Sequence, residues 1–123
     1  MNTVREQPNT KPGVLVDHGG LLLVRSGEVP WQKTDFEGLL WRPLIAGPSK
    51  DRHMSVFRMK KGCIFPAHEH LGTEELYMLS GTLIVEGTRI GAGDYCRAEH
   101  GTFHAPITAI TDADFLLSTD GHL

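Results

Sequence analysis

Hydrophobic residues along the chain fall into short runs that are separated by glycine and proline. Clear runs rich in β-branched, aromatic and other large apolar residues occupy residues 54–59, 75–79, 82–85 and 114–117. No window long enough for a helix has apolar residues at helical spacing without an interrupting breaker. Many short strands between turns predict a β-sandwich or barrel. A parallel α/β sheet would need crossover helices, for which the spacing between the runs leaves no room.

The turns between these runs predict two hairpins. The runs 75–79 and 82–85 are joined through Ser80-Gly81, and we expect them to pair. The run 82–85 is followed by Gly87 and by a turn at residues 91–93, so we expect it to pair also with a strand that starts near Asp94. Glycine adopts the positive φ that such tight turns require.

The length of 123 residues indicates one domain. Residues 1–13 are polar and rich in proline and glycine, which predicts a flexible N-terminal arm. Residues 14–123 are then the single folded domain.

Charge and hydropathy exclude several classes of partner. The formal net charge of −3 gives no basic surface for a phosphate backbone, so we expect no nucleic-acid binding. Apolar runs such as residues 21–24 are far shorter than the roughly 18 residues of a membrane span. The polar first twelve residues have no apolar signal segment, which favours a cytoplasmic protein. In that compartment Cys63 and Cys96 are expected to be reduced and not bridged to each other.

Two histidines lie two positions apart in the stretch from Gly62 to Glu75. On a strand His68 and His70 point to the same face, so two imidazoles can bind one cation. The chain turns after His70, which lets an acidic residue of the next strand approach the same cation. Either Glu74 or Glu75 could supply it, because the two residues lie on opposite faces of that strand.

A further histidine, His104, follows a glycine turn about thirty residues later and precedes a proline. Three histidines and a carboxylate suit Fe, Zn, Mn, Ni or Cu, whereas Mg²⁺ and Ca²⁺ prefer oxygen ligands alone. Taken alone, a His-x-His pair is more often two ordinary surface histidines. That ordinary interpretation is kept for the other histidines, which are His18, His53, His100 and His122.

The sequence offers no obvious side-chain nucleophile, because it contains no G-x-S-x-G motif and no Ser/His/Asp arrangement that suggests a triad. Catalytic residues are therefore not assigned. Some aromatic and sulfur-containing residues could line a pocket, although core packing is the more ordinary interpretation for each: Phe65, Tyr77, Met78, Tyr95 and Phe103.

The two histidine segments together resemble the two motifs of the cupin superfamily. The first motif, G-x5-H-x-H-x3,4-E-x6-G, is matched at every fixed position by Gly62, His68, His70, Glu74 and Gly81. This resemblance selects Glu74 over Glu75 as the carboxylate ligand.

The second motif, G-x5-P-x-G-x2-H-x3-N, is matched by Gly93, Gly101 and His104. Glu99 replaces its proline and Thr108 replaces its asparagine, which affects turn geometry and a structural hydrogen bond but no ligand. The resemblance implies a single-domain cupin jelly-roll barrel with a central metal held by His68, His70, Glu74 and His104.

Within the cupin superfamily, residues 28–118 resemble in particular the cupin domain of ChrR-type anti-sigma factors and small stand-alone cupin dioxygenases. ChrR-type proteins bind their sigma factor through an N-terminal helical zinc domain. About thirty residues without cysteine precede the cupin region here, so we do not expect that domain.

The resemblance implies three kinds of function. The first is a metal-dependent dioxygenase acting on a small dicarbonyl or hydroxyketone-like substrate. The second is a ChrR-like sensory or ligand-binding cupin without turnover, and the third is a sugar-binding or isomerising cupin. Each would bind a small-molecule ligand or substrate.

The family also implies a homodimer. Large apolar residues before the histidine motif support this expectation if they are exposed to water, namely Trp31, Leu39, Leu40 and Trp41.

Overall fold

A computed structural model describes residues 11–44, 53–66, 72–102 and 106–120. The chain separates into two compact units, Met1–Pro30 and Trp31–Leu123. The expected division into an arm of residues 1–13 and a domain of residues 14–123 stays a prediction. In the described part of the chain, no helix has the length and apolar character that crossing a membrane requires.

The first unit contains a β-hairpin. Strands β1 (Val14–His18) and β2 (Leu21–Val24) pair antiparallel, with His18 opposite Leu21, and a single 3₁₀ turn, Ser26–Glu28, follows. The Arg25 amide donates a hydrogen bond of 2.7 Å to the Gly13 carbonyl, which holds the base of the hairpin together. Gly19 and Gly20 form the turn with positive φ, as a two-residue hairpin loop requires.

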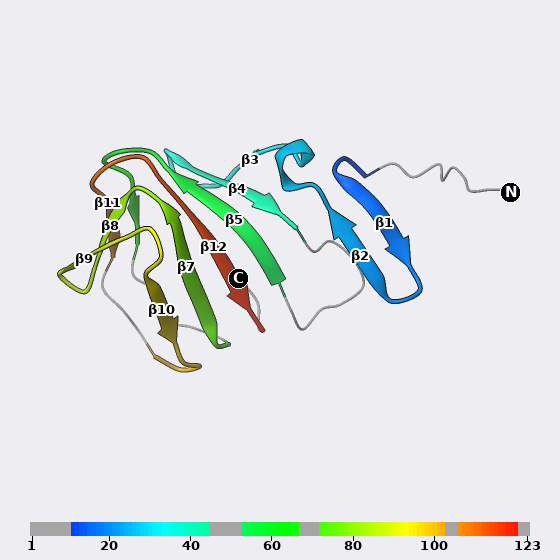
Figure 1. Ribbon diagram of the computed structural model, residues 1–123. Coiled ribbons are helices and arrows are strands. Elements are labelled where there is room, and N and C mark those ends of the chain that lie inside the picture. The colour runs from blue at the N-terminus through cyan, green and yellow to red at the C-terminus, as the bar shows by residue number, and fades with distance from the viewer. Residues whose placement is uncertain (1–10, 45–52, 67–71, 103–105, 121–123) are drawn as a thin grey trace, which may run out of the picture. The chain divides into compact units, whose positions relative to one another are not determined.

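The second unit consists of two antiparallel sheets (Figure 1). The six-stranded sheet has the order β10 (Tyr95–Ala98), β7 (Glu74–Ser80), β12 (Ala113–Thr119), β5 (His53–Met59), β4 (Leu39–Pro43) and β3 (Gln32–Lys33). The four-stranded sheet has the order β6 (Ile64–Phe65), β11 (Ile107–Ala109), β8 (Thr82–Val85) and β9 (Thr88–Gly91). This confirms the all-β fold class, and all four apolar runs named from the sequence lie within strands.

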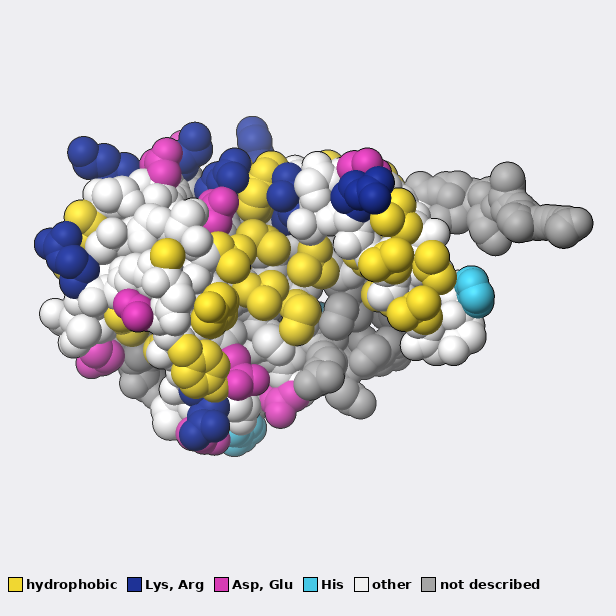
Figure 2. All heavy atoms as spheres, viewed as in Figure 1, with side chains coloured by type: hydrophobic (Ala, Val, Ile, Leu, Met, Phe, Trp, Pro, Cys, Tyr) yellow, Lys and Arg dark blue, Asp and Glu magenta, His cyan; other side chains and the backbone are white. Residues whose placement is uncertain are grey.

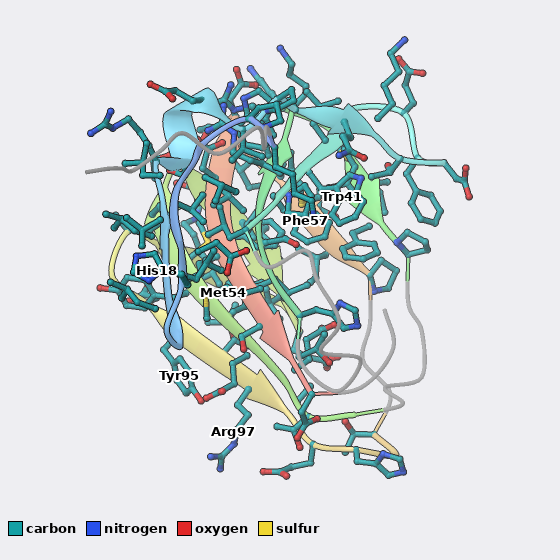
Figure 3. The ribbon with its side chains drawn as sticks, turned by 90° about the vertical axis from the view of Figure 1, so that its right-hand side faces the viewer. His18, Trp41, Met54, Phe57, Tyr95 and Arg97 are labelled. Carbon is teal, nitrogen blue, oxygen red and sulfur yellow. The ribbon has the colours of Figure 1, made fainter. Side chains whose placement is uncertain are left out.

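The inner faces of the two sheets share one hydrophobic core. Phe115, Met78 and Met59 from the six-stranded sheet and Leu83 from the four-stranded sheet are fully buried in it. In Figure 3, Phe57 and Trp41 lie on the inner side of the six-stranded sheet, whereas Met54 and Tyr95 lie on the opposite side. The period of two along each strand therefore decides which residues can reach the interior.

Both hairpin predictions are wrong about the partner strands. The strands β7 and β8 do not pair, because β7 lies between β10 and β12 while β8 lies between β11 and β9. The hairpin after β8 is formed with β9, whereas the strand beyond Asp94, β10, pairs with β7 in the other sheet. Short connections thus carry the chain from one sheet to the other.

Gly81 is the residue that makes the crossing from β7 to β8 possible. Its φ is +79°, and a Cβ added there would lie 2.1 Å from the Asp112 carbonyl oxygen and 2.6 Å from the Ala113 Cα. Only glycine fits, because both the backbone conformation and the space exclude a side chain. A fixed glycine of the first motif therefore has a structural cause.

The outer face of the six-stranded sheet combines apolar side chains with an ion pair. Arg58 on β5 donates two hydrogen bonds to Asp114 on β12, of 2.8 and 2.9 Å. The guanidinium groups of Arg58 and Arg42 lie 4.5 and 4.0 Å from the centre of the Trp31 ring. Figure 2 shows hydrophobic side chains gathered over β7, β12 and β5 on this face.

Candidate metal and ligand site

Glu74 begins strand β7 and faces the interior of the second unit. It is half-buried and shares a face with Leu76 and Met78, which are buried in the core. Glu75 is exposed on the other face, where the Tyr95 hydroxyl of the neighbouring strand donates a hydrogen bond to its carboxylate. A cation inside the barrel could therefore be approached by Glu74 but not by Glu75.

The other three predicted ligands, His68, His70 and His104, lie outside the described residues. Across the part of the chain that is described, no group of three or more His, Cys, Asp and Glu residues could hold a metal ion. The ligand set of His68, His70, Glu74 and His104 stays a prediction.

Polar residues form a row beside Glu74 on the inner face of the six-stranded sheet. Thr119 on β12 is opposite Glu74 on one side and opposite His53 of β5 on the other. Thr119 is buried, and His53 is half-buried. Ser55 lies two residues further along β5, on the same face as the core residue Phe57.

Sequence reasoning did not find this row. His53 was interpreted as an ordinary surface histidine, but it has the same strand parity as Phe57 and Met59 and therefore faces inward. A strand over residues 54–59, extended by one residue, already implies that His53 shares a face with Phe57 and Met59. What the sequence could not give is the pairing of β5 with β12 and β12 with β7, which brings His53 and Glu74 to the same level.

Two further histidines among the described residues lie at the surface. His18 and His100 are exposed, as expected for ordinary surface histidines. His122 lies outside the described residues.

Two cysteines lie near or in the same interior. Cys96 on β10 is opposite Leu76, and burial together with the nearby Glu74 carboxylate raises the pKa of its thiol. Cys63 is buried in the core, and burial raises the pKa of its thiol too. Both thiols are free in the structure.

An aromatic cluster forms the apolar side of the interior. The Phe57 ring stacks on Phe115 at 5.6 Å between centroids and on Trp41 at 6.4 Å. Phe65 lies 6.5 Å from Phe57 and 5.9 Å from Phe36. These rings are packed against one another, so they shape the interior as a rigid apolar wall.

The residues considered for pocket lining divide between the two faces. Met78 is fully buried in the core, and Phe65 is half-buried against it. Tyr77 and Tyr95 are exposed on the outer face, so neither lines the interior. Their strand parity places both tyrosines on the face of the sheet that is turned away from Glu74 and Met78. Phe103 lies outside the described residues.

Several solved structures share this fold. A candidate acetylacetone dioxygenase from Methylibium petroleiphilum is 22% identical over 87% of this chain and 81% of that chain, with a TM-score of 0.74. The acetylacetone dioxygenase from Acinetobacter johnsonii is 18% identical over 98% of this chain and 81% of that chain, with a TM-score of 0.67. At these identities the likeness concerns the fold alone.

A chain of the Rhodobacter sphaeroides complex of SigE with the anti-sigma factor ChrR is 29% identical, with a TM-score of 0.65. The match covers 78% of this chain and 51% of that chain, so it spans about half of the longer protein. No curated protein matches the sequence. The model of the ChrR cupin-like domain matches residues 20–123. Because that match extends over most of the sequence, the chain belongs to the ChrR cupin-like family and has its jelly-roll fold.

Proposed function

We propose that the chain binds one divalent transition metal through His68, His70, Glu74 and His104. The observation that carries this proposal is the register of β7. The motif glutamate is half-buried on the inner face, and the adjacent Glu75 is directed to solvent. An inward carboxylate at the start of a strand whose inner face is buried fits a site of mixed nitrogen and oxygen ligands.

We propose further that the protein is a metal-dependent dioxygenase of a small dicarbonyl or hydroxyketone-like substrate. A metal held by His68, His70, Glu74 and His104 would supply Lewis-acid and redox chemistry to a substrate with oxygen donors. The chain contributes apolar surroundings: Trp41, Phe57 and Phe65 pack against one another in the interior and offer no polar group to a substrate beside them. The likeness to two acetylacetone dioxygenases supports this class of substrate.

The first experiment measures the metal in protein purified without added metal, and then oxygen consumption with acetylacetone. Cleavage of one carbon–carbon bond by O₂, with both oxygen atoms entering the products, consumes equal amounts of the two reactants. A dioxygenase is therefore expected to hold iron or another redox metal and to show that stoichiometry. Absence of oxygen uptake with fully iron-loaded protein, across acetylacetone and simple hydroxyketones, contradicts the dioxygenase proposal.

The family match favours a second candidate, a sensory or ligand-binding cupin without turnover. This function predicts tightly held zinc and reversible ligand binding with no product. The same two measurements separate the candidates, because zinc at full occupancy without oxygen uptake is expected only for the sensor.

A further inference from the structure

In the row of polar residues next to Glu74, Ser55 and His53 have no side-chain partner among the residues that the structure describes. Ser55 is 3% exposed, and its hydroxyl makes no hydrogen bond with any residue that the structure describes. The His53 imidazole likewise has no hydrogen bond or ion pair to the described residues. Buried polar groups in folded proteins nearly always have a partner, so the Ser55 hydroxyl requires one from water or from a bound molecule, and the half-buried His53 ring on the same face can reach the same partner.

The strand register places both groups within reach of whatever Glu74 helps to hold. β12 separates β5 from β7, so the two backbones are two strand spacings apart, or about 9–10 Å. The side chains of His53 and Glu74 extend into the interior from those two backbones at the same level, with Thr119 between them. A ligand of a few carbon atoms can span this distance.

The hydrogen-bonding groups of Ser55 and His53, and the charge of the residues around them, indicate which ligand atoms can bind there. The Ser55 hydroxyl and an imidazole N–H of His53 can both donate, so one acceptor oxygen can satisfy both groups at once, although each group can also accept. On the inner faces of β5, β7, β10 and β12 the described residues include no lysine or arginine. A phosphate or a dicarboxylate would find no counter-charge there, whereas a carbonyl, hydroxyl or enolate oxygen needs none.

We propose that His53 and Ser55 bind an oxygen atom of the ligand on the side away from Glu74, which restricts the ligand to small ketones and hydroxyketones without a second anionic group. The proposal rests on the proposed metal site and deepens it. The core residues Phe57, Leu76 and Leu117 lie at the next levels of the same face and leave only apolar contacts for the rest of the ligand.

The test uses full-length protein loaded with Zn²⁺, which binds oxygen ligands without redox turnover. Calorimetry measures the Kd for acetylacetone in wild type, Ser55→Ala and His53→Phe. Each variant removes one neutral hydrogen bond, so each Kd is expected to rise about 3- to 10-fold at unchanged zinc stoichiometry. His53→Phe keeps a ring of similar size at a half-buried position, so the test remains available if the more deeply buried Ser55→Ala fails to fold.

Matched controls come from outward-facing residues on β5 and on the neighbouring strand β12. Met54→Leu and Ser118→Ala alter the opposite face and are expected to leave the Kd within twofold of wild type. If Ser55→Ala and His53→Phe also remain within twofold, the inference is overturned.

A second probe separates failure of the inference from failure of the proposed function. Acetohydroxamate chelates a metal through two oxygens whether or not the protein recognises diketones. If wild type binds acetohydroxamate but not acetylacetone, the diketone proposal fails, and the loss of acetohydroxamate affinity in the two variants then decides the inference. If wild type takes up no metal, both proposals fail.

Discussion

Glu74 and Glu75 are adjacent in the sequence but face opposite sides of β7. Glu74 starts the inner face that continues with Leu76 and Met78, whereas Glu75 accepts a hydrogen bond from Tyr95 on the outer face. Period-2 alternation left this choice open because the sequence does not say which face is buried. The cupin motif made the choice, and the burial of β7 gives it a physical basis.

We expect Glu74→Ala to lower metal affinity by more than about tenfold. Removing a group that only hydrogen-bonds to a metal ligand already costs about 10–100-fold in metal affinity, and Glu74 is a predicted ligand itself. Glu75→Ala is the matched control and is expected to retain full occupancy. The measurement is metal content per chain after dialysis against a weak chelator. Loss of metal in Glu75→Ala with retention in Glu74→Ala would show that the register assignment is wrong.

His104 tests the second motif in the same assay. His104→Ala is expected to lose metal as Glu74→Ala does, because it removes one of the four predicted ligands. Full occupancy in His104→Ala would mean that this motif marks the fold only, and the dioxygenase proposal would fail with it.

The thiols give a residue-scale prediction about reactivity. Cys63 is 7% exposed, and burial raises its thiol pKa, so at pH 8 it should react with iodoacetamide far more slowly in native than in unfolded protein. Unfolding without reductant should release two reactive thiols per chain. A count of zero would show that Cys63 and Cys96 are bridged.

The raised pKa of Cys63 also has a consequence for stability. The folded state keeps the thiol protonated to a higher pH than the unfolded chain does. Its contribution is therefore fully present below the ordinary thiol pKa and is lost as the pH rises through the folded-state value.

At the scale of elements, the apolar runs predicted the existence of strands but not their partners. The runs 75–79 and 82–85 are both strands, yet they lie in different sheets. A two-residue connection ordinarily indicates a hairpin, but the strand order shows that the chain crosses between sheets here, at the point where Gly81 packs closely against Asp112 and Ala113. Long-range packing, which the local sequence does not encode, decides this.

Gly81→Ala is expected to destabilise the fold strongly. Positive φ alone costs a non-glycine residue roughly 1–2 kcal/mol. Gly87→Ala isolates the cost of positive φ, because Gly87 has a φ of +74° and an added Cβ there would meet nothing within 4 Å. At Gly81 the Cβ would in addition overlap the Asp112 carbonyl, so the loss in the free energy of unfolding should be at least twice that of Gly87→Ala. Equal losses in urea unfolding would contradict this account of the crossing.

At the scale of the whole molecule, two of the apolar residues expected at a dimer interface contribute to the core instead. Leu39 is 2% exposed, and Trp41 is packed against the core, so neither contributes the exposed apolar area expected from the sequence. Three exposed large residues of the second unit lie instead on the outer face of the six-stranded sheet, whereas Phe36 and Ile64 are exposed elsewhere in that unit. Tyr77, Leu79 and Tyr95 are 47, 47 and 54% exposed there.

We expect a homodimer that buries this outer face, because a contiguous apolar patch on a soluble chain is typically an association surface. Sedimentation at micromolar concentration should give twice the mass of 13.6 kDa. Leu79→Glu should shift the equilibrium to the monomer, because dimerisation would then bury an unpaired charge. Ile64 is 55% exposed on β6 in the other sheet, so Ile64→Glu is the matched control and should remain dimeric. A monomeric wild type contradicts the dimer itself, whereas dissociation by Ile64→Glu alone would move the interface to the four-stranded sheet.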